Sequence, residues 1–167
     1  QIIFSDVDGT FLYSRHQVQP GTAAAARRMT ECGIPVVLVS ARMPAAIRPI
    51  LRAAGIAAPL ISYSGALVLD AAGRALYSHT MPVEPAARIL NQLQLRWPQT
   101  VVNYYAEDVW YVADDRTPAV QREERITSVK AVPAEFGGLL SAERLPHKLL
   151  SMAEASVIDA MGQELQT

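Results

Sequence analysis

Two carboxylates in the stretch FSDVDGTFL, Asp6 and Asp8, are the residues of this chain best suited to chemistry. They follow an apolar run and stand directly before Gly9. A carboxylate can attack the phosphorus of a phosphate ester, which divides hydrolysis into two easier displacements, and a second carboxylate can pass protons to and from the oxygens involved. Mg²⁺ prefers oxygen ligands and would offset the repulsion between carboxylate and phosphate. The spacing therefore predicts that Asp6 and Asp8 catalyse phosphoryl chemistry and begin a Mg²⁺ site.

Two further polar clusters also come directly after apolar runs. The sequence SAR follows VVLV, and the sequence SGA follows LISY. In an open α/β sheet the carboxyl ends of parallel strands meet at one edge, where ligands bind, so these clusters should converge with the two carboxylates. Backbone N–H groups beside a glycine or at a helix start, together with hydroxyl groups, can bind phosphoryl oxygens. We therefore expect a phosphate or substrate site composed of Gly9, Thr10, Ser40, Ala41, Arg42, Ser64 and Gly65.

Each of these features also has a simpler interpretation. The Asp-Gly pair between apolar flanks is typical of a β-hairpin turn, although a hairpin leaves Asp6 unexplained. Ser40 can be the N-cap of a helix, Arg42 a solvated helix residue, and the later Ser-Gly pair a plain turn. Surface or packing roles are expected for the histidines, which share no metal-ligand spacing: His16, His79 and His147.

The elements that must position these residues alternate between strand and helix. Apolar runs and glycine-closed helical patterns predict strand, helix, strand, helix and strand at 1–4, 21–32, 34–40, 44–55 and 58–64. This alternation is typical of a parallel sheet with right-handed crossovers. A glycine-containing turn between 66–70 and 75–78 then adds an antiparallel hairpin.

A second unit begins near residue 82. It is predicted as helix, two strands, helix, two strands and helix, at 84–97, 101–107, 109–114, 117–126, 128–132, 147–153 and 154–165. Helical spacing of the apolar residues predicts an inward face made of Ile89, Leu90, Leu93, Trp97, Val157, Ile158, Met161 and Leu165. The fold class is therefore α/β, with a first domain at 1–81 and a smaller α+β domain at 82–167.

The composition excludes several classes of partner. The 167 residues carry a net charge of -1, without a basic tract or an acidic tail, so neither nucleic acid nor an anionic membrane surface is expected as a partner. The apolar runs are far shorter than the roughly 20 residues of a membrane helix. A single cysteine allows no intramolecular disulfide, which fits a reducing cytoplasm. We expect a cytoplasmic protein whose partner is a small molecule.

The motifs resemble those of a known family. DVDGT matches the Asp-x-Asp-Gly-Thr motif of the haloacid dehalogenase (HAD) superfamily, and LVSAR and YSGALV are similar to the second motif and the Asn-Gly-Ala segment of its Cof-type, subfamily IIB phosphatases. Residues 110–132 also resemble the cap of that subgroup. The resemblance implies a Rossmann-like core with a parallel sheet, an inserted α+β cap of type C2, Mg²⁺, and hydrolysis of small phosphorylated metabolites.

The same resemblance implies a role for individual residues. Asp6 would be the nucleophile and a metal ligand, and Asp8 the acid/base group that also ligates metal through its backbone carbonyl. Ser40 would bind phosphate. Two departures are mild, since Ser64 stands where the subgroup usually has Asn, and Ser-Ala-Arg stands at 40–42 where Thr-Gly-Arg is common.

One departure from the family pattern is large. The family's phosphate-binding Lys and its Gly-Asp-x-x-x-Asp metal segment should follow the cap, and neither occurs in this chain. Without the strands of that segment, residues 2–8 would form an exposed, apolar sheet edge. We therefore expect the chain to be part of a longer enzyme, and to be nearly inactive by itself.

The leading functional hypothesis is a Mg²⁺-dependent phosphatase that hydrolyses sugar phosphates or phosphorylated cofactor precursors through an aspartyl phosphate on Asp6. Two alternatives remain open. The absent third and fourth motifs favour a non-catalytic module that binds phosphometabolites or a protein partner. A phosphotransferase or mutase could use the same aspartyl-phosphate chemistry.

Overall fold

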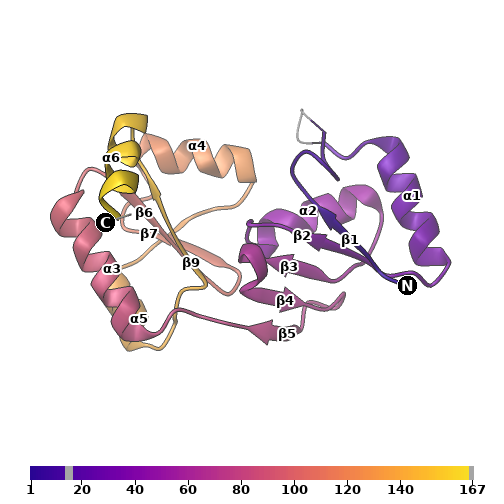
Figure 1. Ribbon diagram of the computed structural model, residues 1–167, viewed down its shortest axis with the longest axis horizontal. Coiled ribbons are helices and arrows are strands. Elements are labelled where there is room, and N and C mark those ends of the chain that lie inside the picture. The colour runs from indigo at the N-terminus through magenta and orange to yellow at the C-terminus, as the bar shows by residue number, and fades with distance from the viewer. Residues whose placement is uncertain (14–16, 166–167) are drawn as a thin grey trace. The chain divides into compact units, whose positions relative to one another are not determined.

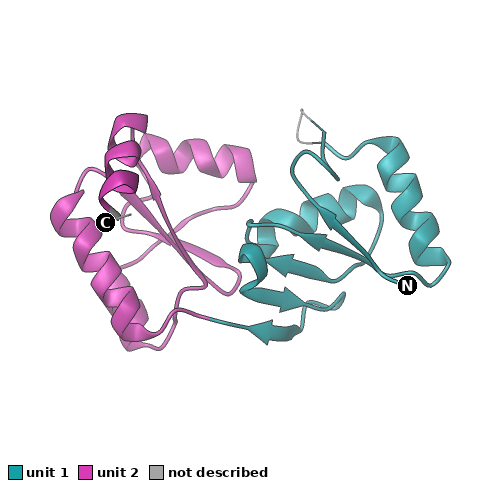
Figure 2. Ribbon diagram, viewed as in Figure 1, with its two compact units in different colours: residues 1–79 teal, residues 80–167 magenta. Residues whose placement is uncertain are grey.

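The computed structural model describes residues 1–13 and 17–165, which form two compact units. Unit 1 comprises residues 1–79 and unit 2 residues 80–167 (Figure 2). The assignment of a core to 1–81 and a cap to 82–167 concerns the roles of the two parts, and it stays a prediction.

Unit 1 is built from alternating strands and helices, as the sequence predicts (Figure 1). Its elements are β1 (Ile3–Asp6), α1 (Pro20–Glu31), β2 (Val36–Val39), α2 (Pro44–Ala54), β3 (Leu60–Ser62), the 3-10 turn η1 (Tyr63–Gly65), β4 (Leu67–Leu69) and β5 (Ala75–Ser78). The strand order is β1-β2-β3-β4-β5, with β1, β2 and β3 parallel and β4 and β5 antiparallel. The predicted parallel sheet and its added hairpin are therefore confirmed.

The core of unit 1 lies between the sheet and its helices. Val36, Val37 and Leu38 of β2 are all buried, which fits a continuous apolar run in a strand with neighbours on both sides. Helix α2 buries Ile47 and Leu51, spaced one turn apart. Helix formation continues through the internal Pro49 and ends at Ala54.

Gly55 ends α2 because its backbone is left-handed, with φ +71°. Replacing Gly55 with Ala should destabilise unit 1 by about 1 kcal/mol, since a Cβ in this conformation is strained. The added Cβ would also lie 3.4 Å from Nη1 of Arg27. We expect a melting temperature lower by roughly 4–8 °C in thermal unfolding. Gly21→Ala is the matched control, because its Cβ meets nothing within 4 Å, and an equal loss in both variants would contradict the account.

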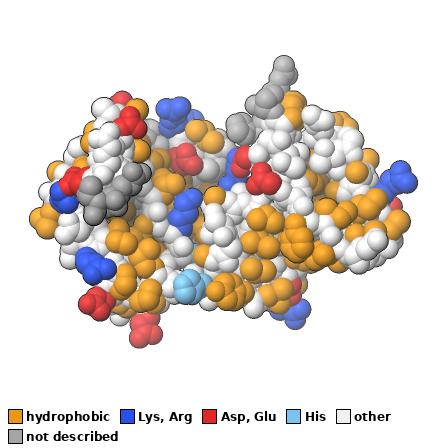
Figure 3. All heavy atoms as spheres, viewed as in Figure 1, with side chains coloured by type: hydrophobic (Ala, Val, Ile, Leu, Met, Phe, Trp, Pro, Cys, Tyr) orange, Lys and Arg blue, Asp and Glu red, His pale blue; other side chains and the backbone are white. Residues whose placement is uncertain are grey.

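Among the described strands, β1 lies at one edge of the five-stranded sheet, as the sequence predicts for this chain. Ile2, Ile3 and Phe4 are exposed, and Phe4 keeps 60% of its surface accessible. Leu76 and Tyr77 of β5 are exposed as well. Figure 3 shows hydrophobic side chains gathered on the surface of unit 1. The predicted apolar edge is confirmed.

Unit 2 is an α+β unit around a second sheet (Figure 1). Its elements are α3 (Val83–Arg96), β6 (Val101–Ala106), β7 (Val109–Val112), α4 (Pro118–Thr127), β8 (Val132–Pro133), α5 (Phe136–Ser141), β9 (Lys148–Met152) and α6 (Ala155–Leu165). The strand order is β8-β7-β6-β9, and only β7 and β8 pair in parallel among these described strands.

The two faces of this second sheet carry different sets of side chains. On one face Tyr104 packs with Tyr111, Ala86 of α3 and Leu140 of α5. On the other face Trp110, only 1% exposed, stacks on Tyr105 and donates its indole N–H to Oδ1 of Asn103 over 2.9 Å. Asn103 in turn donates to the backbone carbonyls of Val101 and Leu150. This buried amide therefore ties β6 to β7 and β9.

Several sequence-based details of unit 2 need correction. Ile89 and Ile158 were predicted to face inward, but both are exposed. The buried face of α3 and of α6 is narrower than the apolar face that the sequence predicts. The strand predicted at 128–132 is reduced to Val132–Pro133, since Ser128 adopts a left-handed conformation at the end of α4. The elements η1 and α5 were not anticipated. His16 and the side chain of Leu165 lie outside the described residues.

Within the described residues, the helices are all too short or too polar to cross a membrane.

Candidate functional site

The first carboxylates lie where β1 ends. Asp6 is the last residue of β1 and pairs with Val39 of β2. Val7 is completely buried, and it anchors the backbone between the exposed residues Asp6 and Asp8. The chain then turns, with Phe11 N–H donating to the Asp6 carbonyl over 3.1 Å. The alternative interpretation as a simple Asp-Gly hairpin is therefore wrong, because Asp8 forms a parallel bridge with Leu12 and β1 has no antiparallel partner among the described strands.

The second cluster lies where β2 ends. Ser40 N–H donates to the Ile61 carbonyl over 2.9 Å, and its hydroxyl oxygen accepts the N–H of Arg42 over 3.1 Å. Helix α2 begins only at Pro44, so the interpretation of Ser40 as its N-cap is wrong. The hydroxyl hydrogen of Ser40 can still be donated to a bound anion.

Arg42 joins the first two clusters. Its Nε donates to Oδ2 of Asp8 over 2.9 Å and its Nη2 donates to Oδ1 over 2.6 Å. Both oxygens of the carboxylate are thus held by one planar guanidinium, the arrangement that gives the strongest and most directional ion pairs. The Arg42 side chain is 22% exposed and that of Asp8 is 46% exposed. Arg42 is therefore not a solvated helix residue.

The third cluster lies where β3 ends. Tyr63, Ser64 and Gly65 have φ angles of +52°, +55° and +105°, a left-handed run that is rare for residues other than glycine. The N–H of Tyr63 donates to the Arg42 carbonyl over 3.3 Å, and the N–H of Ser64 donates to the Ser40 carbonyl over 3.1 Å. The strained turn thus holds the second cluster in place.

The structure brings together most of the residues that the sequence singles out. Hydrogen bonds connect Asp8 to Arg42 and connect 40–42 to 63–64, and Asp6 adjoins them through the pairing of β1 with β2. Gly9 and Ala41 belong to the same loops. Thr10 is exposed, and no described hydrogen bond ties Thr10 or Gly65 to this network.

Sequence reasoning missed two residues at the third strand end. Tyr63 is buried and left-handed, and only the following Ser-Gly pair hints at a turn there. Ser62 is completely buried, and its hydroxyl finds no hydrogen-bond partner within the described part of the chain. The alternation of apolar and polar residues that predicts a strand indicates neither the left-handed backbone of Tyr63 nor the unpaired hydroxyl group of Ser62.

The donor set fits a hard cation only in part. Asp6 supplies a carboxylate, and the carboxylate of Asp8 faces Arg42, which leaves the Asp8 backbone carbonyl as its contribution. Mg²⁺ commonly binds one or two protein carboxylates and completes its shell with water and phosphate oxygens, so these oxygens are suitable ligands. Among residues 1–13 and 17–165 no group of three or more His, Cys, Asp or Glu is placed to hold a metal ion.

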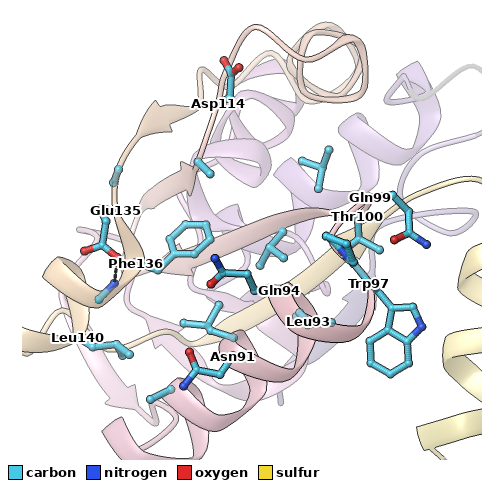
Figure 4. Close-up of a pocket in the computed structure, with 18 of the residues that line it drawn as sticks. Asn91, Leu93, Gln94, Trp97, Gln99, Thr100, Asp114, Glu135, Phe136 and Leu140 are labelled. Carbon is cyan, nitrogen blue, oxygen red and sulfur yellow. Dashed lines mark hydrogen bonds between the residues drawn. The ribbon is translucent and has the colours of Figure 1, made fainter.

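Unit 2 contains a cavity of about 730 Å³, whose lining differs in charge from the loops of unit 1. Figure 4 shows Asn91 and Gln94 of α3, Trp97 just after that helix, and Glu135 and Phe136 around it. Its described lining residues include no Lys, Arg or His. They do include Asp114, whose carboxyl pKa is lowered by hydrogen bonds from the Arg116 side chain. A cavity whose described lining residues include Asp114 and Glu135 but no cationic residue disfavours a phosphate dianion, so the loops of unit 1 remain the candidate phosphate site.

The chain is similar in sequence to known proteins. A family model described as haloacid dehalogenase-like hydrolase matches residues 3–167. A Haemophilus influenzae protein named "Putative phosphatase" is 32% identical over 157 residues, covering 93% of this chain and 58% of that relative. Phosphatase YwpJ of Bacillus subtilis is 34% identical over 107 residues, covering 64% of this chain and 35% of the relative.

The fold has a clear counterpart among solved structures. A crystal structure from Thermotoga maritima superposes with a TM-score of 0.82 at 20% identity, covering 99% of this chain and 61% of that chain. At this identity the likeness concerns the fold alone, and it fits a Rossmann-like α/β core. The chain spans less than two thirds of the length of each protein it is compared with here.

Proposed function

This chain belongs to the haloacid dehalogenase-like hydrolase family, and from that premise we propose that it acts as a Mg²⁺-dependent phosphatase on small phosphorylated metabolites. The observation that carries the proposal is the convergence of three strand ends in unit 1, where Asp6 closes β1 and Arg42 ties Asp8 to the loop after β2. Sugar phosphates or phosphorylated cofactor precursors are the proposed substrates.

In the proposed mechanism Asp6 is the nucleophile. A carboxylate oxygen of Asp6 forms a bond to phosphorus while the ester P–O bond breaks, and Asp8 gives its proton to the departing alkoxide. Asp8 then accepts a proton from the water that attacks the aspartyl phosphate, which releases inorganic phosphate and restores Asp6. Mg²⁺, held by the Asp6 carboxylate and the Asp8 carbonyl, would supply charge neutralisation between the nucleophile and the phosphate.

The remaining residues of the loops are proposed to bind the phosphoryl oxygens. Ser40, Thr10 and Ser64 offer hydroxyl groups that can donate to phosphate oxygens, and the loop backbone around Gly9 can approach a phosphate closely. The spacing of Ser40 and Ser64 is set by the hydrogen bonds between the second and third strand ends. The proposed phosphate ligands are Gly9, Thr10, Ser40, Ala41, Ser64 and Gly65, with Arg42 beside them and paired to Asp8.

Unit 2 is proposed to be the cap that selects the substrate, with the cap boundaries at 82–167. Its separate sheet and separate core support a unit that folds around its own residues. A cytoplasmic location is part of the same proposal.

A non-catalytic, phosphate-binding protein is the second candidate. It is favoured by one observation, namely that fewer than three potential acidic, His or Cys ligands meet anywhere in the described part of the chain. The two candidates differ in turnover. A protein that binds inorganic phosphate with Mg²⁺ but releases no product from phosphate esters would support the second candidate.

Removing divalent metal should abolish turnover. We expect hydrolysis of p-nitrophenyl phosphate, measured on the longest chain that the gene encodes, to fall to the buffer rate with a chelator and to recover with added Mg²⁺. The reason is that Asp6 cannot approach a phosphate dianion without charge neutralisation. Ca²⁺ is the control, because its larger and more flexible coordination shell should restore much less activity. Full turnover in excess chelator would contradict the proposed metal dependence.

A further inference from the structure

The ion pair between Asp8 and Arg42 joins two loops that are 34 residues apart in sequence. It uses both carboxylate oxygens and two different guanidinium nitrogens, over 2.9 and 2.6 Å. Two parallel hydrogen bonds fix the plane of a carboxylate as well as its position, which a single contact to a point charge does not do.

The backbone on each side of this pair is anchored independently of it. On the Asp8 side, Val7 is completely buried and its carbonyl accepts the N–H of Leu12 over 2.8 Å. On the other side, the N–H of Arg42 donates to the Ser40 hydroxyl, and its carbonyl accepts the N–H of Tyr63. Loss of the ion pair therefore removes the two-point contact to the Asp8 carboxylate while leaving the backbone of the two loops in place.

We propose that Arg42 is a positioning residue for Asp8, and that it orients the Asp8 carboxylate for proton transfer instead of serving chiefly as a phosphate ligand. This inference rests on the proposed function, because it concerns the proton that Asp8 gives to the leaving oxygen and takes from water. Proton transfer requires the carboxyl oxygen to lie within hydrogen-bond reach of the reacting oxygen. The Asp8 side chain is 46% exposed, and the two parallel bonds from Arg42 set the plane in which its oxygens lie.

The positioning role differs from phosphate binding in what it predicts for each kinetic constant. A residue that only orients the acid/base group affects the chemical step, so its loss lowers kcat while KM stays nearly unchanged. A direct phosphate ligand contributes to substrate binding as well, so its loss raises KM and weakens inhibition by inorganic phosphate.

The test compares wild type, Arg42→Ala, Arg42→Lys, Asp8→Asn and the double variant Asp8→Asn with Arg42→Ala, in the longest chain that the gene encodes. We expect Arg42→Ala to lower kcat by about 10- to 100-fold, as misplaced catalytic groups do. KM and the inhibition constant of inorganic phosphate should change by less than about threefold. Arg42→Lys should recover part of kcat, because an ammonium group keeps the charge but cannot hold both oxygens in one plane.

The double variant separates a role through Asp8 from an independent role. If Arg42 acts through Asp8, removing Arg42 from the Asp8→Asn variant should cost nothing further. p-Nitrophenyl phosphate suits this comparison because its residual rate stays measurable, and because the proton that Asp8 takes from the attacking water is needed whatever the leaving group. Arg74→Ala is the matched control, since Arg74 forms an exposed ion pair with Asp70 in the same unit and should leave both constants unchanged. Circular dichroism on each variant confirms folding.

The kinetic results distinguish failure of the positioning role from failure of the proposed function. A multiplicative loss in the double variant, or a rise in KM equal to the loss in kcat, would overturn the positioning role while leaving the phosphatase proposal intact. Wild type without any turnover would overturn the proposed function, and this inference would fall with it.

Discussion

The Asp6→Asn variant should lose turnover almost entirely, by about 10⁴-fold or more, as enzymes do when their nucleophile is removed. An amide oxygen is a weak nucleophile and cannot form the aspartyl phosphate, while the shape of the side chain is kept. Asp6 is exposed at the end of β1, so the substitution disturbs no core packing. The measurement is the steady-state rate with p-nitrophenyl phosphate in Mg²⁺, together with acid-quenched trapping of the phosphorylated protein.

Asp70→Asn provides the matched control for this variant. Asp70 lies in the turn between β4 and β5, where hydrogen bonds from the backbone and side chain of Arg74 lower its carboxyl pKa. It is a carboxylate of the same unit outside the three loops, so its replacement should leave turnover unchanged. Phosphorylated protein recovered from Asp6→Asn at the wild-type level would show that another residue is the nucleophile.

Trp110→Ala should be the most damaging substitution for stability. The indole is almost completely buried, and its removal leaves a cavity as well as an Asn103 oxygen without its donor. Truncation of a buried Trp typically costs about 3–5 kcal/mol, a large part of the stability of an ordinary domain. We expect unit 2 to unfold at a much lower urea concentration, measured by circular dichroism.

Trp110→Phe is the informative companion to that variant. Phenylalanine keeps much of the ring volume against Tyr105 but lacks the N–H that reaches Asn103. It should cost about 1–3 kcal/mol, the range for leaving one buried polar group unsatisfied. A Trp110→Ala variant as stable as wild type would mean that this side chain is not part of the core of unit 2.

The architecture of unit 1 could be predicted because it depends on strong, local patterns. The run Val36–Val39 is apolar at every position, and the helices end at Gly55 and shortly before Gly33, whose left-handed φ angles of +71° and +74° suit glycine. In unit 2 the helix α5 was missed because Gly137 and Gly138 have poor helix propensity. It forms because the Glu135 carboxylate accepts both of their N–H groups, which satisfies donors that a short helix leaves open.

The location of the candidate site was predictable, whereas its internal contacts were not. The rule that ligands bind at the carboxyl edge of a parallel sheet places Asp6, Ser40 and Ser64 near one another without any knowledge of side chains. The partner of Arg42 depends on the rotamers of two residues 34 positions apart, and no local pattern encodes that choice. The left-handed backbone of Tyr63 likewise follows from tertiary hydrogen bonds to the neighbouring loop.

The left-handed run at Tyr63–Gly65 bears on how this site can vary between proteins. A left-handed backbone admits Gly, Asn and Asp at little cost and excludes β-branched residues, so the conformation restricts position 64 before any ligand does. Ser and Asn differ in reach and in hydrogen-bonding groups, yet both are small polar residues compatible with such a turn. An exchange between them would therefore alter what the loop offers a substrate without refolding the loop. If this loop binds the substrate as proposed, a single substitution at position 64 can change the groups that it offers.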